Sequence, residues 1–346
     1  MFKELLDKKG FWSQRGPYSD VVLSTRVRLG RNVQGVPFPH KQDEKDADKI
    51  KSIAETFIQN SQYNNCTALY DLKEIDSNDK RFLRERNILT YEMEVSNNGF
   101  VILDNNENFS ILVNEEDHFR VQIIKSGFQL METYQFADLI DDELNKFVPY
   151  AFSDDFGYIT ACPSNLGTGL RISTMLHLPA LSISGGIPEV IRKTSELGAK
   201  ISGSLGDGTK TFGNMYLLSN RISLGLSEVD IIEEIDKITS KVVEMESLAR
   251  DNFISQEDDK LKDMIWRYYG ILKYSRSISY TEAMDYLSNI RLGIILFIIK
   301  DIELQEVNNM MINIQWSHLQ KIANRIFSNS YECDSFRSEY IRMNLA

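Results

Sequence analysis

The sequence predicts an α+β protein, in which an antiparallel β-sheet flanked by helices is followed by a small all-helical domain. Between residues 100 and 125, three strand-like runs (FVIL, FSILV and FRVQIIK) are separated only by short Asn- and Asp-rich turns. Such short connections force antiparallel pairing, because a parallel crossover needs about a dozen residues or more. After about Asp251 the apolar pattern has a helical period and no strand signal remains.

Periodicity and capping residues place the remaining elements. The expected elements, in chain order, are a strand at 21–23, a helix between 41 and 60, a strand at 156–161, a helix at 187–197 that stops at Gly198, and two strands around the GSLGDGTKTFG segment. Ser227 is expected to cap an amphipathic helix, and Ser279 with Glu282 forms a capping box. We therefore predict two domains, residues 1–250 and residues 251–346.

Composition excludes several classes of protein. The formal net charge of the 346 residues is -11, which disfavours a nucleic-acid-binding surface. Cys66, Cys162 and Cys333 lack the spacing of a disulfide framework or a zinc site, so a reducing cytoplasm is expected. The N-terminus does not read as a signal peptide, and the apolar run from Leu292 to Ile299 is too short to span a membrane.

The segment Ser24-Thr25-Arg26-Val27-Arg28 is the first candidate for function. Arg26 and Arg28 alternate on an extended chain, so both side chains point to one face. Guanidinium groups match the oxygens of a polyphosphate. The alternative is a solvated edge strand with scattered charge, and this pattern alone favours that alternative.

An acidic run between Asn114 and Arg120 follows the apolar strand ILV. Its adjacent carboxylates repel one another, which an exposed loop tolerates. Alternatively, one carboxylate orients a cationic substrate and accepts its proton. His118 within the run is interpreted as a structural hydrogen-bonding residue.

Two glycine-containing loops are further candidates. The segment from Cys162 to Arg171, CPSNLGTGLR, has a shaped backbone that can approach a ligand closely, although a plain turn would also explain it. It lacks the GK[ST] of a P-loop. Gly206-Asp207-Gly208 is either a plain hairpin turn or a lid that carries one carboxylate.

In this order, VVLSTRVRLGRN, VNEEDHFR and CPSNLGTGLR resemble three signatures of the guanidino (phosphagen) kinase family, over roughly residues 15 to 250. Creatine and arginine kinases carry a helical substrate domain ahead of the first signature, for which this chain has no room. After residue 250, SYTEAMDYL and NIRLGI are similar to the protein arginine kinase branch. The resemblance implies a guanidino kinase (glutamine synthetase-like) catalytic domain that transfers phosphate from ATP to arginine side chains of proteins.

The resemblance also implies roles for individual residues. It makes Glu116 the catalytic carboxylate, Asp207 a second carboxylate and Cys162 a residue beside the substrate guanidinium. ATP and magnesium are the implied cofactors, and no residue is assigned as a metal ligand. The implied nucleotide site consists of the STRVR segment and two further arginines: Ser24, Thr25, Arg26, Val27, Arg28, Arg120 and Arg171.

The chain departs from the pattern of the branch at three places. Ser202 stands where a phosphate-binding arginine is expected, and Lys200 would face the same side of the strand. Asn87 stands about where a nucleotide-contacting histidine is expected. Asp334 and Arg337 are what remains of a phosphoarginine-binding motif, so a weak site of that kind is predicted.

Three functional hypotheses follow from the resemblance. The first is an active protein arginine kinase linked to protein quality control. The second is a weakly active or inactive relative that binds phosphoarginine or partner proteins. The third, a small-molecule guanidino kinase, is least favoured because the upstream domain is missing. Implied partners are proteins with exposed arginines, a second copy in a homodimer, a zinc-containing activator protein and the ClpC unfoldase, with no nucleic acid and no membrane.

Overall fold

A computed structural model describes residues 1–8, 10–96, 99–203, 211–255 and 259–345. Within them the main sheet has eight strands in the order β2-β3-β4-β5-β1-β8-β10-β9, and all neighbours are antiparallel. The predicted antiparallel fold class is thereby confirmed. The strands are β1 (Val22–Arg31), β2 (Thr67–Asp71), β3 (Phe100–Asp104), β4 (Ser110–Val113), β5 (Phe119–Ser126), β8 (Leu170–His177), β9 (Ala199–Gly203) and β10 (Met215–Asn220).

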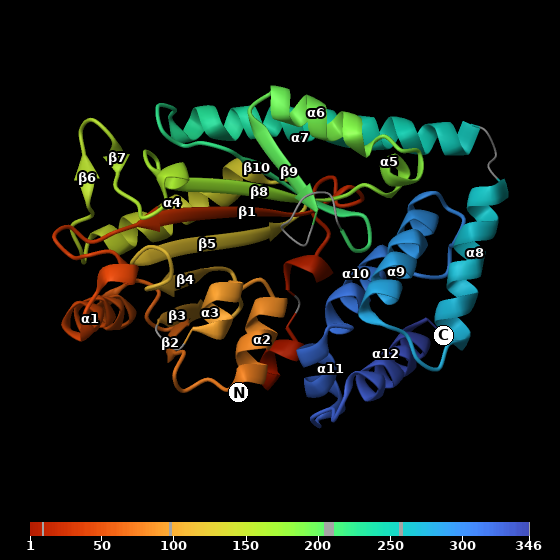
Figure 1. Cartoon of the computed structure of the whole chain (residues 1–346), viewed down its shortest axis with the longest axis horizontal. Coiled ribbons are helices and arrows are strands. Elements are labelled where there is room, and N and C mark those ends of the chain that lie inside the picture. The colour runs from red at the N-terminus through yellow and green to blue at the C-terminus, as the bar shows by residue number, and fades with distance from the viewer. Residues whose placement is uncertain (9, 97–98, 204–210, 256–258, 346) are drawn as a thin grey trace.

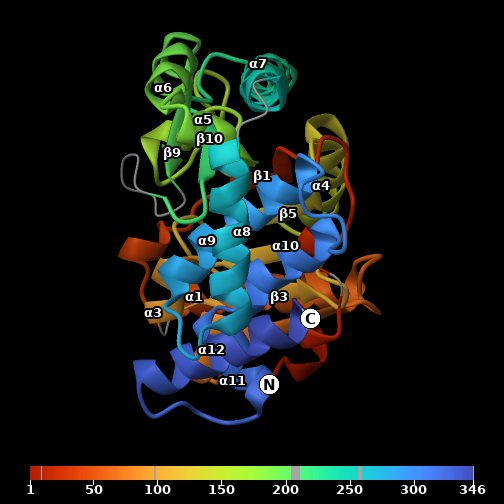
Figure 2. The ribbon, with the colours of Figure 1, turned by 90° about the vertical axis from the view of Figure 1, so that its right-hand side faces the viewer.

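Helices pack against this sheet and also form the C-terminal part of the chain (Figure 1). Helices α8 to α12 gather at one end of the sheet, and Figure 2 shows them from that side. None of the described helices combines the length and apolar composition needed to cross a membrane. The helices are α1 (Glu44–Asn60), α2 (Ser77–Glu85), α3 (Tyr91–Val95), α4 (Leu130–Asn145), α5 (Pro179–Ile183), α6 (Ile187–Glu196), α7 (Glu228–Ser255), α8 (Asp259–Tyr274), α9 (Tyr280–Ile295), α10 (Leu304–Asn313), α11 (Trp316–Ala323) and α12 (Ser330–Asn344).

Most elements expected from the sequence are confirmed. The strand expected at residues 21–23 begins at Val22 and continues to Arg31, so both arginines of the first motif lie on it. Helix α6 is followed by Gly198 at φ +87°, a conformation that glycine adopts without strain. The capping box of Ser279 and Glu282 is present on α9. Helix α7 crosses the predicted boundary at residue 250, and the division into two domains stays a prediction.

The strand expected from Phe156 to Ala161 is wrong. Only Gly157–Tyr158 (β7) forms a strand, and it pairs with Phe152–Ser153 (β6) in a small hairpin. The next residues bond to other partners, since the Ala161 amide donates to Asp117 Oδ1 at 2.8 Å. Apolar character indicated a strand here, but this backbone is held by a side chain of another loop.

One face of the sheet is fully covered. Odd-numbered β1 residues such as Val27 and Leu29 pack in the same core as Ile50 of α1, Ala137 of α4 and Ile232 of α7. Period-two alternation places the neighbouring even-numbered residues on the opposite face. The hydrophobic layer therefore fixes which β1 side chains remain available for function.

The opposite face is covered only at its two sides. Over β3 and β4, Leu112 packs with Phe82 of α2 and Met93 of α3. Near β8 and β10, Met215 packs with Met284 of α9 and other residues of the C-terminal helices. The middle of this face, formed by β5, β1 and β8, lies between these two covers.

Arg291 of α9 ties the C-terminal helices to the central strands. Its side chain is fully buried and donates to the carbonyl oxygens of Ser19 and Asp20, just before β1, and to Asn308 Oδ1 at 2.9 Å. It also lies 2.6 Å from Nδ1 of His177, the last residue of β8. One side chain thus contacts four polar groups from three separate segments.

We expect Arg291→Met to lower the free energy of unfolding by about 2–4 kcal/mol, because several buried acceptors lose their donor at once. Urea denaturation of the full chain measures this. Arg267→Met on α8 is the control, since its partner Asp263 and Arg267 itself are mostly exposed, and it should change stability by at most about 0.5 kcal/mol. Equal effects of the two substitutions would contradict the assignment.

Candidate active site

Four arginines meet on the open middle of the sheet. Arg26 and Arg28 lie on β1, Arg120 on β5 and Arg171 on β8. In the sheet register, Arg28 is directly opposite Arg171, and Arg120 is opposite Gly30. Directly opposed residues of antiparallel strands share a face, so all four side chains leave the sheet on the same side. The structure thus brings together the arginines of three separate motifs.

The charges of these arginines are poorly compensated. Burial, and then the charges of Arg120 and Arg171, lower the pKa of Arg26 to about 10. Burial and the other three arginines lower the pKa of Arg28 well below its usual range. Burial also lowers the pKa of Arg171, which nearby Cys162 and Glu116 oppose. Like charges at close range disfavour the protonated forms, so a bound polyanion would stabilise this cluster.

Within the described residues, Arg120 is the member of this cluster that pairs with carboxylates. Arg120 forms ion pairs of 2.7 Å with Glu115 and 2.6 Å with Glu116. Ion pairs of Arg26, Arg28 or Arg171 with an acid do not occur there, and Arg28 Nε is buried without a hydrogen-bond partner. The cluster therefore retains unmatched donors of the kind that phosphate oxygens satisfy.

The two adjacent glutamates differ in their surroundings. The Glu115 side chain is only 5% exposed; its Oε1 accepts from Thr90 Oγ1 at 3.1 Å and its Oε2 binds Arg120 and the Glu116 amide. The Glu116 side chain is 41% exposed and has a single ion pair, with Arg120. Glu115 is thus fixed by several partners, whereas Glu116 can turn to a new one.

A buried polar hub holds the Cys162 loop beside the acidic run. Asp117 Oδ1 accepts from Asn32 Nδ2 at 2.7 Å and from the Ala161 amide at 2.8 Å. At the far end of the loop, Gly169 has φ +67°, and a Cβ there would lie 2.6 Å from the Gly30 carbonyl oxygen. The loop is therefore fixed to β1, with Cys162 Sγ 3.1 Å from Ser164 Oγ.

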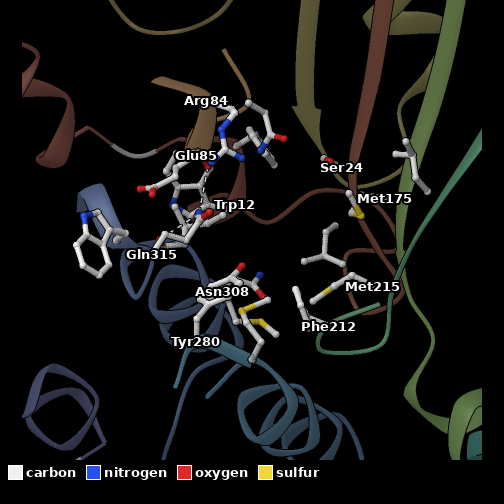
Figure 3. A pocket seen from close by; sticks show the side chains of 18 of the residues that line it. Trp12, Ser24, Arg84, Glu85, Met175, Phe212, Met215, Tyr280, Asn308 and Gln315 are labelled. Carbon is white, nitrogen blue, oxygen red and sulfur yellow. Dashed lines mark hydrogen bonds between the residues drawn. The ribbon is translucent and has the colours of Figure 1, made fainter. Parts of the chain in front are cut away.

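Two cavities border the arginine cluster. The larger of them lies between the sheet and the C-terminal helices and has a volume of about 550 Å³. Figure 3 shows Ser24 and Met175 of the sheet on one side and Tyr280, Asn308 and Gln315 on the other. Arg26, Asn87, Asp334 and Arg337 also line it. Its mixture of aromatic, thioether and amide groups suits an aromatic base and a sugar.

The second cavity, of about 420 Å³, is lined by Arg28, Arg120 and Glu116 together with residues of α3 and its N-terminal cap. Arg26 and Arg28 are two residues apart on β1, a rise of about 7 Å. They line the larger and the smaller cavity respectively. One strand therefore leads from a site that fits a nucleoside to a site that holds a carboxylate.

Several residues singled out in the sequence lie outside the cluster. The Thr25 hydroxyl donates to the Gly127 carbonyl oxygen at 2.7 Å, and Val27 is in the core, so both side chains belong to the helical side of the sheet. The buried His118 ring accepts from the Val33 amide at 2.9 Å, in agreement with a structural role. Asp207 lies outside the described residues.

Ser202 and Lys200 lie on β9 on the same face as the arginines. Lys200 is opposite Ser219 of β10, which is opposite Ser173 of β8, which in turn is opposite Arg26. Ser202 is one row further on, opposite Leu217, a residue that lines the larger cavity.

Arg337 has partners within the C-terminal helices. Its guanidinium donates to the carbonyl oxygens of Ile314 and Ile278, both at 2.9 Å, and pairs with Asp334. Arg337 and Asp334 are therefore part of the wall of the larger cavity, and binding of phosphoarginine there stays a prediction.

Comparison with known proteins identifies the class. A family model described as ATP:guanido phosphotransferase, C-terminal catalytic domain, matches residues 49–249, more than half of the chain. A second, described as Protein-arginine kinase McsB C-terminal domain, matches residues 258–346. The chain therefore belongs to the ATP:guanido phosphotransferase family, in its protein-arginine kinase branch. The resemblance inferred from the three motifs is confirmed.

Relatives and solved structures agree. The protein-arginine kinases of Clostridium acetobutylicum and Caldanaerobacter subterraneus are 38% and 36% identical to this chain. The match spans 94% of this chain in both cases, and 96% and 97% of the two relatives. A duplicated taurocyamine kinase from Schistosoma mansoni with bound transition state analog components is similar in structure, with TM-score 0.61 and 28% identity over 70% of this chain and 35% of that one. Lombricine kinase shows the same fold, with TM-score 0.58 and 22% identity over 69% of each chain.

Sequence reasoning missed the contributions of α3 and of the C-terminal helices to the two cavities. Thr90 and Glu92 line the smaller cavity, and Tyr280 and Asn308 line the larger one. No local pattern marks these residues, because each lies far along the chain from the arginines. The run of three acids likewise gave no sign that Glu115 is held by several partners while Glu116 is partly exposed.

We expect Glu116→Gln to lower the rate of phosphoryl transfer by about 10²–10⁴-fold, because the role predicted for this carboxylate is to accept a proton. Stability should change little, since the side chain is partly exposed. Glu115→Gln is the matched comparison and should weaken nucleotide affinity, because Arg120 loses a fixed partner. Single-turnover rates measure the effect expected of Glu116→Gln, and nucleotide titrations measure the effect expected of Glu115→Gln. Wild-type turnover in Glu116→Gln would refute the role.

Proposed function

We propose that this protein phosphorylates arginine side chains of proteins, with ATP as the phosphoryl donor. The observation that carries the proposal is the cluster of Arg26, Arg28, Arg120 and Arg171, whose charges need an anion, next to the partly exposed Glu116. Curated relatives named protein-arginine kinase span nearly the whole chain, which supports a protein acceptor.

In this proposal ATP lies along β1. Its adenosine occupies the larger cavity by Ser24 and Met175, and its phosphates extend past Arg26 toward Arg28 and Arg171. The arginines neutralise the charge of the transferring group, which is the main contribution a protein makes to this reaction. In this proposal magnesium is held mostly by the phosphates. Magnesium would supply further charge neutralisation there.

The acceptor guanidinium is proposed to lie between Glu116 and the phosphate cluster. A protonated guanidinium has no free lone pair, so one nitrogen must lose a proton as its bond to the γ-phosphorus forms. Glu116 takes that proton, the bond from the γ-phosphorus to the bridging oxygen breaks, and ADP leaves. Cys162, held by its fixed loop, positions the acceptor without forming a covalent bond to it. Asp207 is proposed as a second carboxylate.

The test is incubation of the full chain with ATP, magnesium and an unfolded arginine-rich protein, followed by mass spectrometry under conditions that preserve phosphoarginine. We expect phosphoryl groups on arginine and an equal amount of ADP. ATP hydrolysis without phosphoarginine, or transfer only to a free guanidino compound, would contradict the proposal.

The departure at position 202 predicts a weak enzyme. An arginine that stabilises the transferring group can be worth about 10³–10⁵-fold in rate, and Ser202 cannot supply its charge. Lys200 shares the face of the arginines and offers a point charge instead. We expect Ser202→Arg to raise kcat at least about tenfold and Lys200→Ala to lower it. The test is to measure the turnover of the wild type and both variants on one unfolded substrate, with ATP affinity measured separately. No change in either variant would show that another residue supplies the charge.

The cellular setting is proposed from resemblance. We propose a cytoplasmic enzyme of protein quality control that forms a homodimer and works with a zinc-containing activator protein and the ClpC unfoldase. The C-terminal helices are the proposed site of self-association, and Asp334 with Arg337 the proposed weak phosphoarginine site.

A further inference from the structure

Helix α3 borders the smaller cavity and also presents an exposed surface. Tyr91 and Val95 are 65% and 63% exposed, and Glu92 is also exposed. Residues three and four apart lie on one side of a helix, so these three side chains form a single surface. Of the three residues, Glu92 lines the smaller cavity, and Tyr91 and Val95 lie next to it on α3. Exposed apolar side chains gathered beside a charged one are typical of a contact surface.

This surface is held rigidly in place. Met93 of α3 is buried in the core and also lines the smaller cavity, and Glu94 pairs with Arg84 of α2. The Thr90 hydroxyl, which caps α3, donates to Glu115 Oε1 at 3.1 Å. The position of α3 is therefore coupled directly to the acidic run that carries Glu116.

Glu92 belongs both to this exposed surface and to the lining of the smaller cavity. It lines the cavity that also contains Glu116, Arg28 and Arg120. Glu115 and Glu116 are paired with Arg120, whereas Glu92 has no ion pair within the described parts of the chain. Its negative charge thus remains available to a cation that approaches the cavity.

We propose that the α3 surface, formed by Tyr91, Glu92 and Val95, binds the residues that flank the acceptor arginine of an extended substrate polypeptide. The inference rests on the proposed function, because the polypeptide is placed by its arginine at Glu116. Each extended residue advances about 3.3 Å, so positions within two or three residues of the arginine reach the rim. Apolar flanking side chains pack on Tyr91 and Val95, and a flanking lysine or arginine pairs with Glu92.

The test compares two synthetic peptides with one central arginine, flanked by Leu and Lys in the first and by Gly and Asp in the second. We expect the wild type to prefer the first peptide about tenfold in kcat/KM. The variant Tyr91→Ala/Glu92→Gln/Val95→Ser should lose this preference through a higher KM for the first peptide. Glu92→Lys alone should invert the charge preference while leaving the apolar contacts in place.

The control variant Tyr274→Ala/Glu244→Gln removes an equally exposed tyrosine and glutamate from α8 and α7, and it should keep the preference. An unchanged preference in the α3 variants, or none in the wild type, would overturn the proposal. So would conversion of a dimer to a monomer by the α3 variant in sedimentation, since a second copy would then cover α3.

Failure of the proposed function would look different. The wild type would phosphorylate neither peptide, and the α3 proposal would then be decided by binding alone. Fluorescence anisotropy of the labelled Leu/Lys peptide gives that answer. Weaker binding to the α3 variant than to the control variant supports the surface, and equal binding overturns it.

Discussion

Mutual repulsion among four arginines on one sheet face is the constraint on which the site depends. Arg28 lies directly opposite Arg171, and burial lowers the pKa of both. The opposite face of the same strands is packed with apolar residues such as Val27 and Leu29, and this packing holds the strands in register. Apolar packing on one face of the sheet thus offsets the cost of repulsion among the arginines on the other face. A bound polyanion would remove that cost.

Two parts of the structure hold the acidic run of residues 114–120 in place. Asp117 and Asn32 connect it to the Cys162 loop, and Thr90 connects it to α3 through Glu115. These contacts leave Glu116 as the carboxylate that is free to accept a new partner. Helix α3, which is proposed to carry a substrate surface, and the loop that carries Cys162 are therefore both anchored to the same short segment.

The C-terminal helices take part in the site as well as covering the sheet. Tyr280 and Asn308 form a wall of the larger cavity, opposite Ser24 and Met175 (Figure 3). Arg291 holds the same helices to the ends of β1 and β8 through buried hydrogen bonds. Displacement of these helices would therefore change the cavity in which the nucleotide is proposed to bind.

The sequence by itself determined the antiparallel sheet, the helical C-terminal region and the family, because short connections, periodicity and three contiguous motifs are local properties. Because each motif is contiguous in the chain, the sequence also identified Arg26, Glu116 and Cys162 as candidate site residues. Only the tertiary structure decided that Arg28 faces Arg171, that Glu115 is fixed while Glu116 is not, and that α3 and α9 reach the site. The strand expected at Phe156 failed for the same reason, since its backbone is bound by Asp117 from another loop. Pairing partners and cavity walls come from residues far apart in the chain, and local patterns carry no record of which distant segments pack together.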